Sequence, residues 1–75
     1  MVLIDSPAEL GAAVRETRKA LGLTQPQLAL TAGVGVRFIV ELEAGKPTVR
    51  LENVLRVVKA LGGRLAVEGP PQGLV

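Results

Sequence analysis

Signals that start and stop helices alternate along this chain and divide most of it into short helical segments. Ser6-Pro7-Ala8-Glu9 and Thr24-Gln25-Pro26-Gln27 each combine an N-cap hydroxyl, an early proline and an acid or amide three residues after the cap. Gly22, Gly33 and Gly45 follow at positions where a helix can end. We therefore expect helices over about residues 7–21, between the Thr24 cap and Gly33, and over about residues 36–43.

Apolar residues recur at helical spacing between these signals, so each expected helix has one face for a core. In the first helix the spaced residues are Leu10, Ala13, Val14, Thr17 and Leu21. Pro47 prevents an early restart, and a fourth helix is expected beyond it. Its continuous apolar stripe is predicted to be Leu51, Val54, Leu55, Val58 and Leu61.

A short strand is expected after Gly62-Gly63, because Arg64-Leu65-Ala66-Val67-Glu68 alternates with a period of two. A lone strand needs a partner for its backbone groups. The partner is either Val2-Leu3-Ile4 of the same chain or the same strand of a second copy. We favour a homodimer, because it adds the buried surface that so small a domain lacks. Residues 69–75 are expected to form a flexible tail, which leaves one domain over residues 1–68.

Composition excludes several classes of function. The 75 residues are 48% hydrophobic but only 1% aromatic, so the core must be aliphatic, with Phe38 as its one ring. The absence of Cys and His removes disulfides, thiolate or imidazole zinc sites and histidine acid–base chemistry. No apolar run reaches the length of a membrane span. We therefore expect a cytoplasmic protein that is not an enzyme, with no cofactor, no metal, no membrane partner and no small-molecule substrate.

The tight connection Gly33-Val34-Gly35 joins the two middle helices. Gly33 permits the positive φ that a sharp turn needs, and Val34 can fill the gap between the helices. Ala29 lets the helices approach closely. This is the helix-turn-helix arrangement, in which the second helix enters the major groove of DNA.

A wider pattern is more specific than the turn alone. It comprises Arg18-Lys19-Ala20-Leu21-Gly22-Leu23-Thr24-Gln25, Leu28-Ala29, Ala32-Gly33-Val34, Ile39, Leu42-Glu43 and Gly45-Lys46. This pattern resembles the phage-repressor-like (Cro/C1, or XRE) helix-turn-helix family. The stretch from Phe38 to Leu51, with Leu61-Gly62 and the short strand, looks like its HipB-like antitoxin branch, often operon partners of HipA-type kinase toxins.

The resemblance implies a fold and a setting. The fold is an all-α, lambda-repressor-like domain of roughly four to five helices, with a C-terminal strand that pairs across a dimer through residues 64–68. The setting is a prokaryotic cytoplasm, where the protein associates with the nucleoid. The implied partners are double-stranded operator DNA, a second copy of the chain and a HipA-like toxin kinase.

The resemblance also implies backbone contacts to DNA. Gln25 opens the second helix, where the glutamine of the family meets a phosphate and braces the recognition helix. The alternative for Gln25 is a surface polar residue beside a cap. Gln27 suits the capping box as well as DNA. Lys46 and Arg50 are expected phosphate contacts, with solvated charges as the alternative.

The base-reading positions implied by the family are Gly35, Val36, Arg37, Val40 and Glu41. Arg37 can donate two hydrogen bonds to guanine, or pair with Glu41 four residues on. Val36 and Val40 suit thymine methyl groups, with a sugar contact as the alternative for Val40, and Glu41 can accept from cytosine or repel phosphate. Ser, Thr, Gln or Arg commonly fill the positions of Gly35, Val36 and Val40, so this face has one strong donor and shape readout gains weight.

Arg18 and Glu43 have a different implied role. In the family the two positions commonly form an ion pair that ties the first helix to the end of the third. The lesser alternative for Arg18 is a phosphate contact.

Two functions fit these observations. The first is a dimeric, sequence-specific DNA-binding repressor, an antitoxin that neutralises a HipA-like kinase and autoregulates its operon. The second is a protein-interaction module of the same fold with weak or no DNA binding, which the apolar Val36 and Val40 favour.

Overall fold

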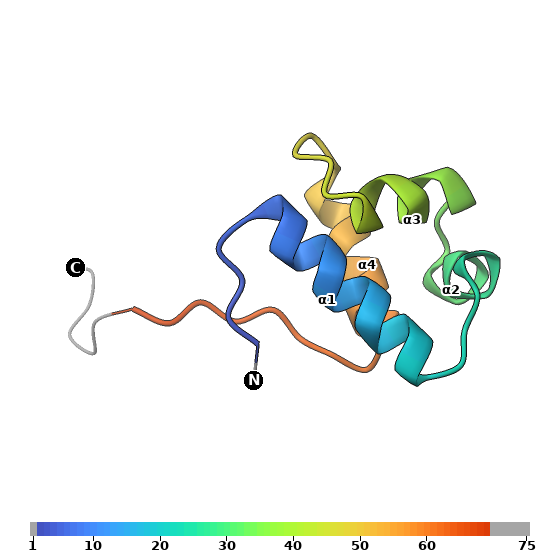
Figure 1. Ribbon diagram of the computed structural model, residues 1–75, viewed down its shortest axis with the longest axis horizontal. Coiled ribbons are helices and arrows are strands. Elements are labelled where there is room, and N and C mark those ends of the chain that lie inside the picture. Colours follow the sequence, from blue (N-terminus) through green and yellow to red (C-terminus); the bar gives the residue numbers. More distant parts are fainter. Residues whose placement is uncertain (1, 70–75) are drawn as a thin grey trace.

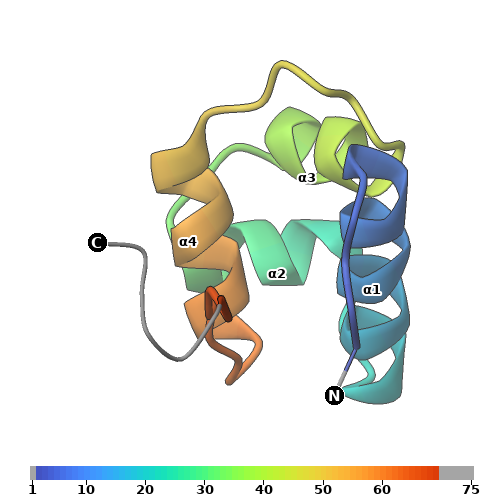
Figure 2. The same cartoon turned by 90° about the vertical axis from the view of Figure 1, so that its left-hand side faces the viewer.

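The computed structural model describes residues 2–69, and this part of the chain contains four α-helices. Helix α3 packs against both α1 and α2, and α4 packs against α2. Figure 2 shows α1 and α4 on opposite sides, with α2 between them and α3 across one end (Figures 1 and 2). The helices are α1 (Pro7–Ala20), α2 (Gln25–Ala32), α3 (Val36–Glu43) and α4 (Leu51–Ala60).

Local capping chemistry sets the helix boundaries, as the sequence predicts. The Ser6 hydroxyl accepts from the Glu9 backbone N–H at 3.1 Å and begins α1. Thr24 and Gln27 form a complete capping box at the start of α2. Gly33 ends α2 with φ of 74°, the left-handed conformation that the tight turn requires.

The core is aliphatic, as the composition predicts. Phe38, the one aromatic residue, is only partly buried at its edge. Because each helix contributes one or two of the core residues, no helix can leave the bundle without exposing them. The buried hydrophobic residues are Val14, Leu28, Ala29, Ile39, Leu42, Val54 and Val57.

Two of the predicted apolar faces are partly wrong. Helix α4 buries Val54 and Val57, whereas Leu51 and Leu55 are 65% and 47% exposed. The reason is that α4 packs mainly on α2, so only the narrow face centred on Val54 and Val57 is covered. Of the residues predicted to face the core from the first helix, Val14 is buried as expected, whereas Thr17 and the C-cap residue Leu21 are exposed. Gly11 and Arg18 are buried in addition, although the pattern did not predict them.

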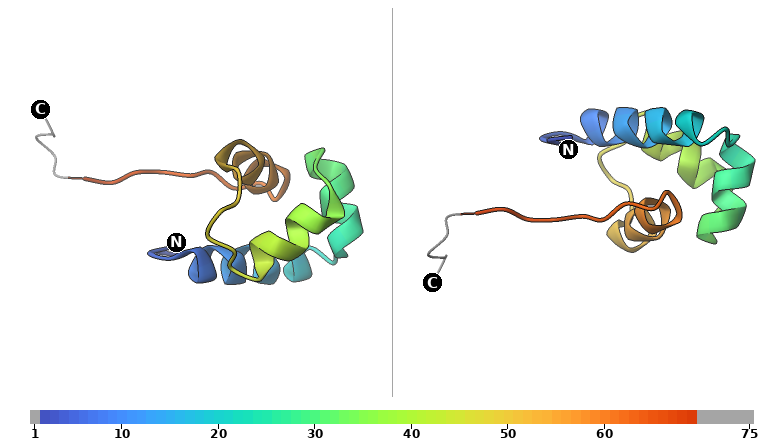
Figure 3. Two further views of the ribbon diagram at one scale, coloured as in Figure 1. Left: turned by 90° about the horizontal axis from the view of Figure 1, so that it is seen from above. Right: turned by 90° about the horizontal axis from the view of Figure 1, so that it is seen from below.

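The segment after α4 is extended and leads away from the helices (Figures 1 and 3). Among residues 2–69 it forms no strand, and no backbone hydrogen bond joins residues 2–4 to residues 64–68. Pairing within the chain is therefore not observed, and pairing across a dimer stays a prediction. Of the expected tail, residues 70–75 lie outside the described part of the chain.

The four described helices are all too short or too polar to cross a membrane.

Helices α1 and α3 approach each other closely at Gly11. A Cβ atom at Gly11 would clash with the carbonyl oxygen of Leu42 and lie 2.8 Å from that of Glu43. The backbone of α1 therefore rests directly on the last turn of α3. This contact brings the side chains further along α1 within reach of Glu43.

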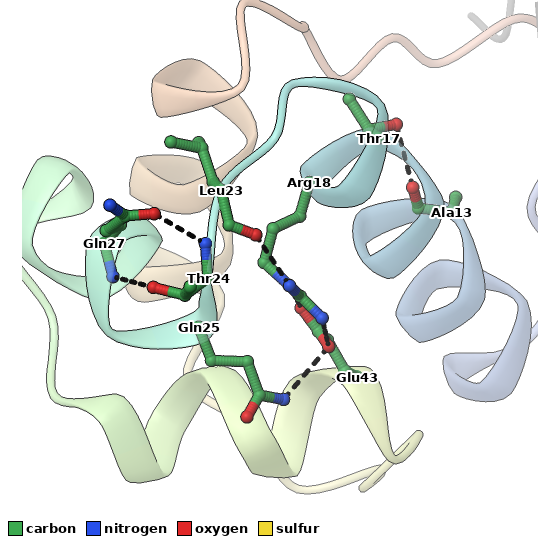
Figure 4. Close-up of polar contacts among 8 residues, drawn as sticks. All are labelled: Ala13, Thr17, Arg18, Leu23, Thr24, Gln25, Gln27 and Glu43. Atoms are coloured by element: carbon green, nitrogen blue, oxygen red, sulfur yellow. Dashed lines mark hydrogen bonds and ion pairs between the residues drawn. The ribbon is translucent and has the colours of Figure 1, made fainter.

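Arg18 and Glu43 form a bidentate ion pair across this contact (Figure 4). Arg18 Nε lies 2.6 Å from Glu43 Oε2, and Arg18 Nη2 lies 3.0 Å from Oε1. The remaining guanidinium nitrogen, Nη1, donates to the Leu23 carbonyl oxygen at 2.8 Å. The two side chains are only 9% and 4% exposed, so the pair joins α1, the loop before α2 and the end of α3 in the protein interior.

Hydrogen bonding decides the charge state of this pair. Burial alone raises the pKa of Glu43, but hydrogen bonds from Arg18 and Gln25 together hold that pKa below its ordinary value. The hydrogen bond to Glu43 raises the pKa of Arg18. Both groups are therefore charged at neutral pH, and removing one would leave the other buried without its partner.

Replacing Arg18 with Met should lower the free energy of unfolding by about 3–5 kcal/mol, because the Glu43 carboxylate would stay buried and unpaired. Urea unfolding followed by circular dichroism measures this loss. The matched control is Arg56→Met, which breaks an exposed pair with Glu52 at 3.8 Å and should cost less than about 1 kcal/mol. Adding Glu43→Leu to Arg18→Met should restore much of the stability. Equal costs for the two single variants would contradict a structural role for the pair.

The depressed pKa of Glu43 also predicts acid sensitivity. Because the folded pKa lies below the ordinary value of 4.5, the stabilisation is complete above 4.5 and is lost as pH falls through the folded pKa. The melting temperature should therefore fall steeply below that pH. Glu43→Gln should be less stable at neutral pH and lose less on acidification. If the melting temperatures of the unmodified protein and of Glu43→Gln fell in parallel with pH, Glu43 would not be the source of the acid sensitivity.

Candidate nucleic-acid interface

Helix α3 has one face in the core and one in solvent. Ile39 and Leu42 are 0% and 1% exposed. On the opposite face Val36 and Val40 are 42% and 45% exposed, and the Arg37 side chain is 89% exposed. Since α1 and α2 hold the inner face, the outer face stands free at a fixed orientation.

Gly35 is the N-cap residue of α3 and is exposed. Its backbone is extended, and its carbonyl oxygen accepts from the backbone N–H groups of Phe38 and Ile39. It thereby starts α3 directly after the turn at Gly33. No side chain accepts a hydrogen bond from the first amides of α3.

Gln25 is bound to the buried ion pair. Its Nε2 donates to Glu43 Oε1 at 3.1 Å, from the first residue of α2 to the last residue of α3 (Figure 4). A primary amide has two N–H groups, and this bond uses one of them. Within residues 2–69 no acceptor is found for the other, which makes it the candidate donor to a phosphate oxygen. The bond to Glu43 thus links Gln25, the candidate phosphate contact, to α3.

Gln27 is engaged in local structure. Its Oε1 accepts from the Thr24 backbone N–H at 2.8 Å, and its own backbone N–H donates to the Thr24 hydroxyl at 3.2 Å. These are the two bonds of a capping box. Gln27 therefore has the capping role that the sequence suggested for it.

Lys46 lies in a turn with fixed geometry after α3. Gly45 has φ of 82°, and the Lys46 backbone N–H donates to the Glu41 carbonyl oxygen at 3.1 Å. A Cβ at Gly45 would lie 2.9 Å from Ala8 Cα, so α1 also packs on this turn. The turn therefore fixes the backbone of Lys46 beside the end of α3.

Arg37, Glu41 and Lys46 form an ionic cluster on the outer side of α3. Arg37 Nε lies 3.4 Å and Lys46 Nζ 3.2 Å from the same oxygen, Glu41 Oε2. The hydrogen bond from Lys46 is the main cause of a lowered pKa of Glu41; partial burial opposes it and Arg37 adds to it. Glu41 is therefore a carboxylate at neutral pH, and it forms ion pairs with both Arg37 and Lys46.

Arg50 is less closely connected to α3. It is the N-cap residue of α4 and pairs with Glu52 at 3.6 Å, with 76% of its side chain exposed. In the C-terminal segment all five residues from Arg64 to Glu68 are exposed, and Val67 is 97% exposed.

The family resemblance implied that Gln25 braces the recognition helix, but it did not identify Glu43 as the partner. Two further contacts were missed: the Leu23 carbonyl bond to Arg18, and the Lys46 pair with Glu41. The last had a detectable signal, because a helix-ending glycine places the next residue near the carbonyl five residues earlier. The others depend on how helices far apart in sequence meet. Within residues 2–69 no group of three or more His, Cys, Asp or Glu side chains could hold a metal ion.

Comparison with known proteins agrees with this geometry. The helix-turn-helix family model matches residues 14–67 of the chain. An "Uncharacterized HTH-type transcriptional regulator y4mF" of Sinorhizobium fredii is 51% identical over 67 residues, which cover 89% of this chain and 88% of that protein.

Solved structures share the fold. One is the HipA-HipB-O2-O3 complex, with a TM-score of 0.84 at 23% identity over 92% of this chain and 97% of that one. Another is the restriction-modification controller protein C.AhdI from Aeromonas hydrophila, with a TM-score of 0.70 at 33% identity over 77% and 84% of the two chains. From the matched family model, the curated relative and the helix pair itself, the chain belongs to the Cro/C1-type (XRE) helix-turn-helix family.

Proposed function

We propose that the chain is a sequence-specific repressor that places α3 in the major groove of double-stranded operator DNA. The observation that carries this proposal is the free outer face of α3, which presents Val36, Arg37 and Val40 while its inner face is locked in the core. An α-helix fits the major groove, and a helix held by neighbours keeps its side chains in register with base edges.

Backbone contacts position the protein on the duplex in this account. Gln25 offers its second amide hydrogen and Lys46 its ammonium group, and both lie near the C-terminal end of α3. Contacts to phosphate carry no sequence information but set register, and each contributes about 0.9 to the salt slope of binding. Arg50 is a weaker candidate of the same kind.

Base recognition rests mainly on Arg37. Its guanidinium can donate two hydrogen bonds to the O6 and N7 atoms of guanine. Val36 and Val40 can contact thymine methyl groups, and Glu41 can accept from the amino group of cytosine. With one strong donor per α3, a single copy binds weakly, and two copies double the contacts.

A dimer supplies the second reading helix. The backbone of residues 64–68 makes no strand within the chain, and Leu65 and Val67 are exposed beside it. Pairing of this segment with its counterpart in a second copy would give its backbone groups hydrogen-bond partners and would cover Leu65 and Val67. The two α3 helices would then meet half-sites about 34–36 Å apart.

The finer role that we propose is that of an antitoxin which binds a HipA-like kinase and represses its own operon. Its support is the sequence pattern from Phe38 to Leu51 and the likeness of fold to HipB in the HipA-HipB-O2-O3 complex. Co-purification with a HipA-like kinase encoded by the adjacent gene tests this role. An adjacent kinase that neither co-purifies nor loses activity on addition of the protein would contradict it.

A second candidate function is a protein-interaction module of the same fold. The exposed Val36 and Val40 favour it, since apolar side chains also suit a protein partner. A gel shift with DNA from upstream of the gene, across a salt series, separates the two functions. Specific binding that weakens steeply with salt supports the repressor, whereas an intact dimer that binds no DNA at low salt supports the module.

Arg37→Ala should leave folding unchanged and weaken binding to the target duplex by about 1–3 kcal/mol, because a bidentate guanine contact is lost. Fluorescence anisotropy with a labelled duplex measures the change. Arg56→Ala, an exposed arginine on α4, is the matched control and should bind as the unmodified protein does. Equal affinities for the two variants would remove Arg37 from the reading set.

Deleting residues 64–75 should lower the fraction of dimer in sedimentation velocity, because the proposed intersubunit strand is removed. The control is deletion of residues 70–75 alone, which leaves that strand in place. A truncated protein that remains fully dimeric would assign the interface to the helices instead.

A further inference from the structure

We propose that Glu41 is a specificity-determining residue that restrains α3 from binding non-target DNA, because its carboxylate holds Arg37 and Lys46 in ion pairs that a duplex must break. The inference rests on the proposed DNA binding and concerns its regulation. The observation behind it is that two cations expected to contact DNA share one acidic oxygen atom on the outer side of α3.

The geometry gives these pairs unequal strength. Arg37 is 89% exposed and its Nε lies 3.4 Å from Glu41 Oε2, so that pair alone restrains little. Lys46 is 46% exposed, and its backbone N–H is bonded to the carbonyl of Glu41 itself. Because the Gly45 turn fixes this link, the lysine starts close to the carboxylate and loses less side-chain freedom on pairing.

Charge makes Glu41 unfavourable to a phosphate backbone in two ways. It repels phosphate directly, and it neutralises part of the charge of two cations. Helix α3 has one other acid, Glu43, but that carboxylate is buried and paired with Arg18. Glu41 is therefore the acid on α3 that opposes DNA from the exposed side.

The restraint acts unequally on target and non-target DNA. Non-target binding depends on phosphate contacts, so each cation held by Glu41 reduces it. On target DNA, Arg37 gains a guanine and Glu41 can accept a hydrogen bond from a cytosine amino group, which offsets the broken pairs. Glu41 should thus lower the affinity for every duplex. The reduction should be largest for a duplex in which no cytosine amino group is positioned to donate a hydrogen bond to Glu41.

The test is Glu41→Gln, which removes the charge and keeps nearly the same shape and helix propensity. Affinities are measured by fluorescence anisotropy for the upstream target duplex and for a scrambled duplex of equal length, at several salt concentrations. For the scrambled duplex we expect binding about three- to tenfold tighter at low salt, and a salt slope steeper by about 0.9 for each additional phosphate that the released cations neutralise. The ratio of target to scrambled affinity should fall.

Two further variants isolate the mechanism. Glu16→Gln makes the same charge change on an exposed residue of α1, outside the ionic cluster, and should leave the ratio unchanged. The increase in affinity from Glu41→Gln should shrink when Lys46→Gln is already present, because no lysine is left to release. An equal increase in both backgrounds would show simple repulsion and overturn the restraint.

Failure of the inference and failure of the proposed function give different results. If the unmodified protein binds the target duplex and Glu41→Gln changes neither affinity nor ratio, the restraint is wrong and DNA binding stands. If the folded protein and Glu41→Gln both bind no duplex at low salt, both proposals are overturned.

Discussion

The buried hydrogen bonds to the Glu43 carboxylate are the interactions on which the rest of this small domain depends. This carboxylate accepts from Arg18 of α1 and from Gln25 of α2 while standing at the end of α3. A buried charge is costly unless every hydrogen-bonding site is occupied, and no buried side-chain polar atom among the described residues lacks a partner. The carboxylate that ties the end of α3 to α1 therefore also orients Gln25, the candidate phosphate contact.

Two carboxylates two residues apart on α3 have opposite roles in this account. Glu43 is buried and fixes the position of α3, whereas Glu41 is partly exposed and holds the cations that DNA would use. Residues two positions apart on a helix point in different directions. The same carboxylate group therefore stabilises the fold at Glu43 and restrains DNA binding at Glu41. A short helix of eight residues can in this way carry both its anchor and its control.

Local signals were sufficient to predict much of the fold. The caps at Ser6 and Thr24 and the left-handed Gly33 act within a few residues, so their positions in the sequence locate the helices. The buried face of a helix depends instead on which neighbours it meets, and periodicity alone misassigned Leu51 and Leu55. The family resemblance implied that Gln25 braces α3, but its bond to Glu43 spans 18 residues and follows from tertiary packing, so the local pattern does not identify that partner. The DNA contacts and the dimer strand remain predictions.

Amide chemical-shift mapping on addition of the upstream duplex tests the central claim most directly. If the outer face of α3 meets DNA, the largest shifts should fall on Val36, Arg37 and Val40, with further shifts at Gln25 and Lys46. The core amides of Ile39 and Leu42 should change less. Shifts confined to α4 or to the N-terminal segment, with α3 unchanged, would contradict the account.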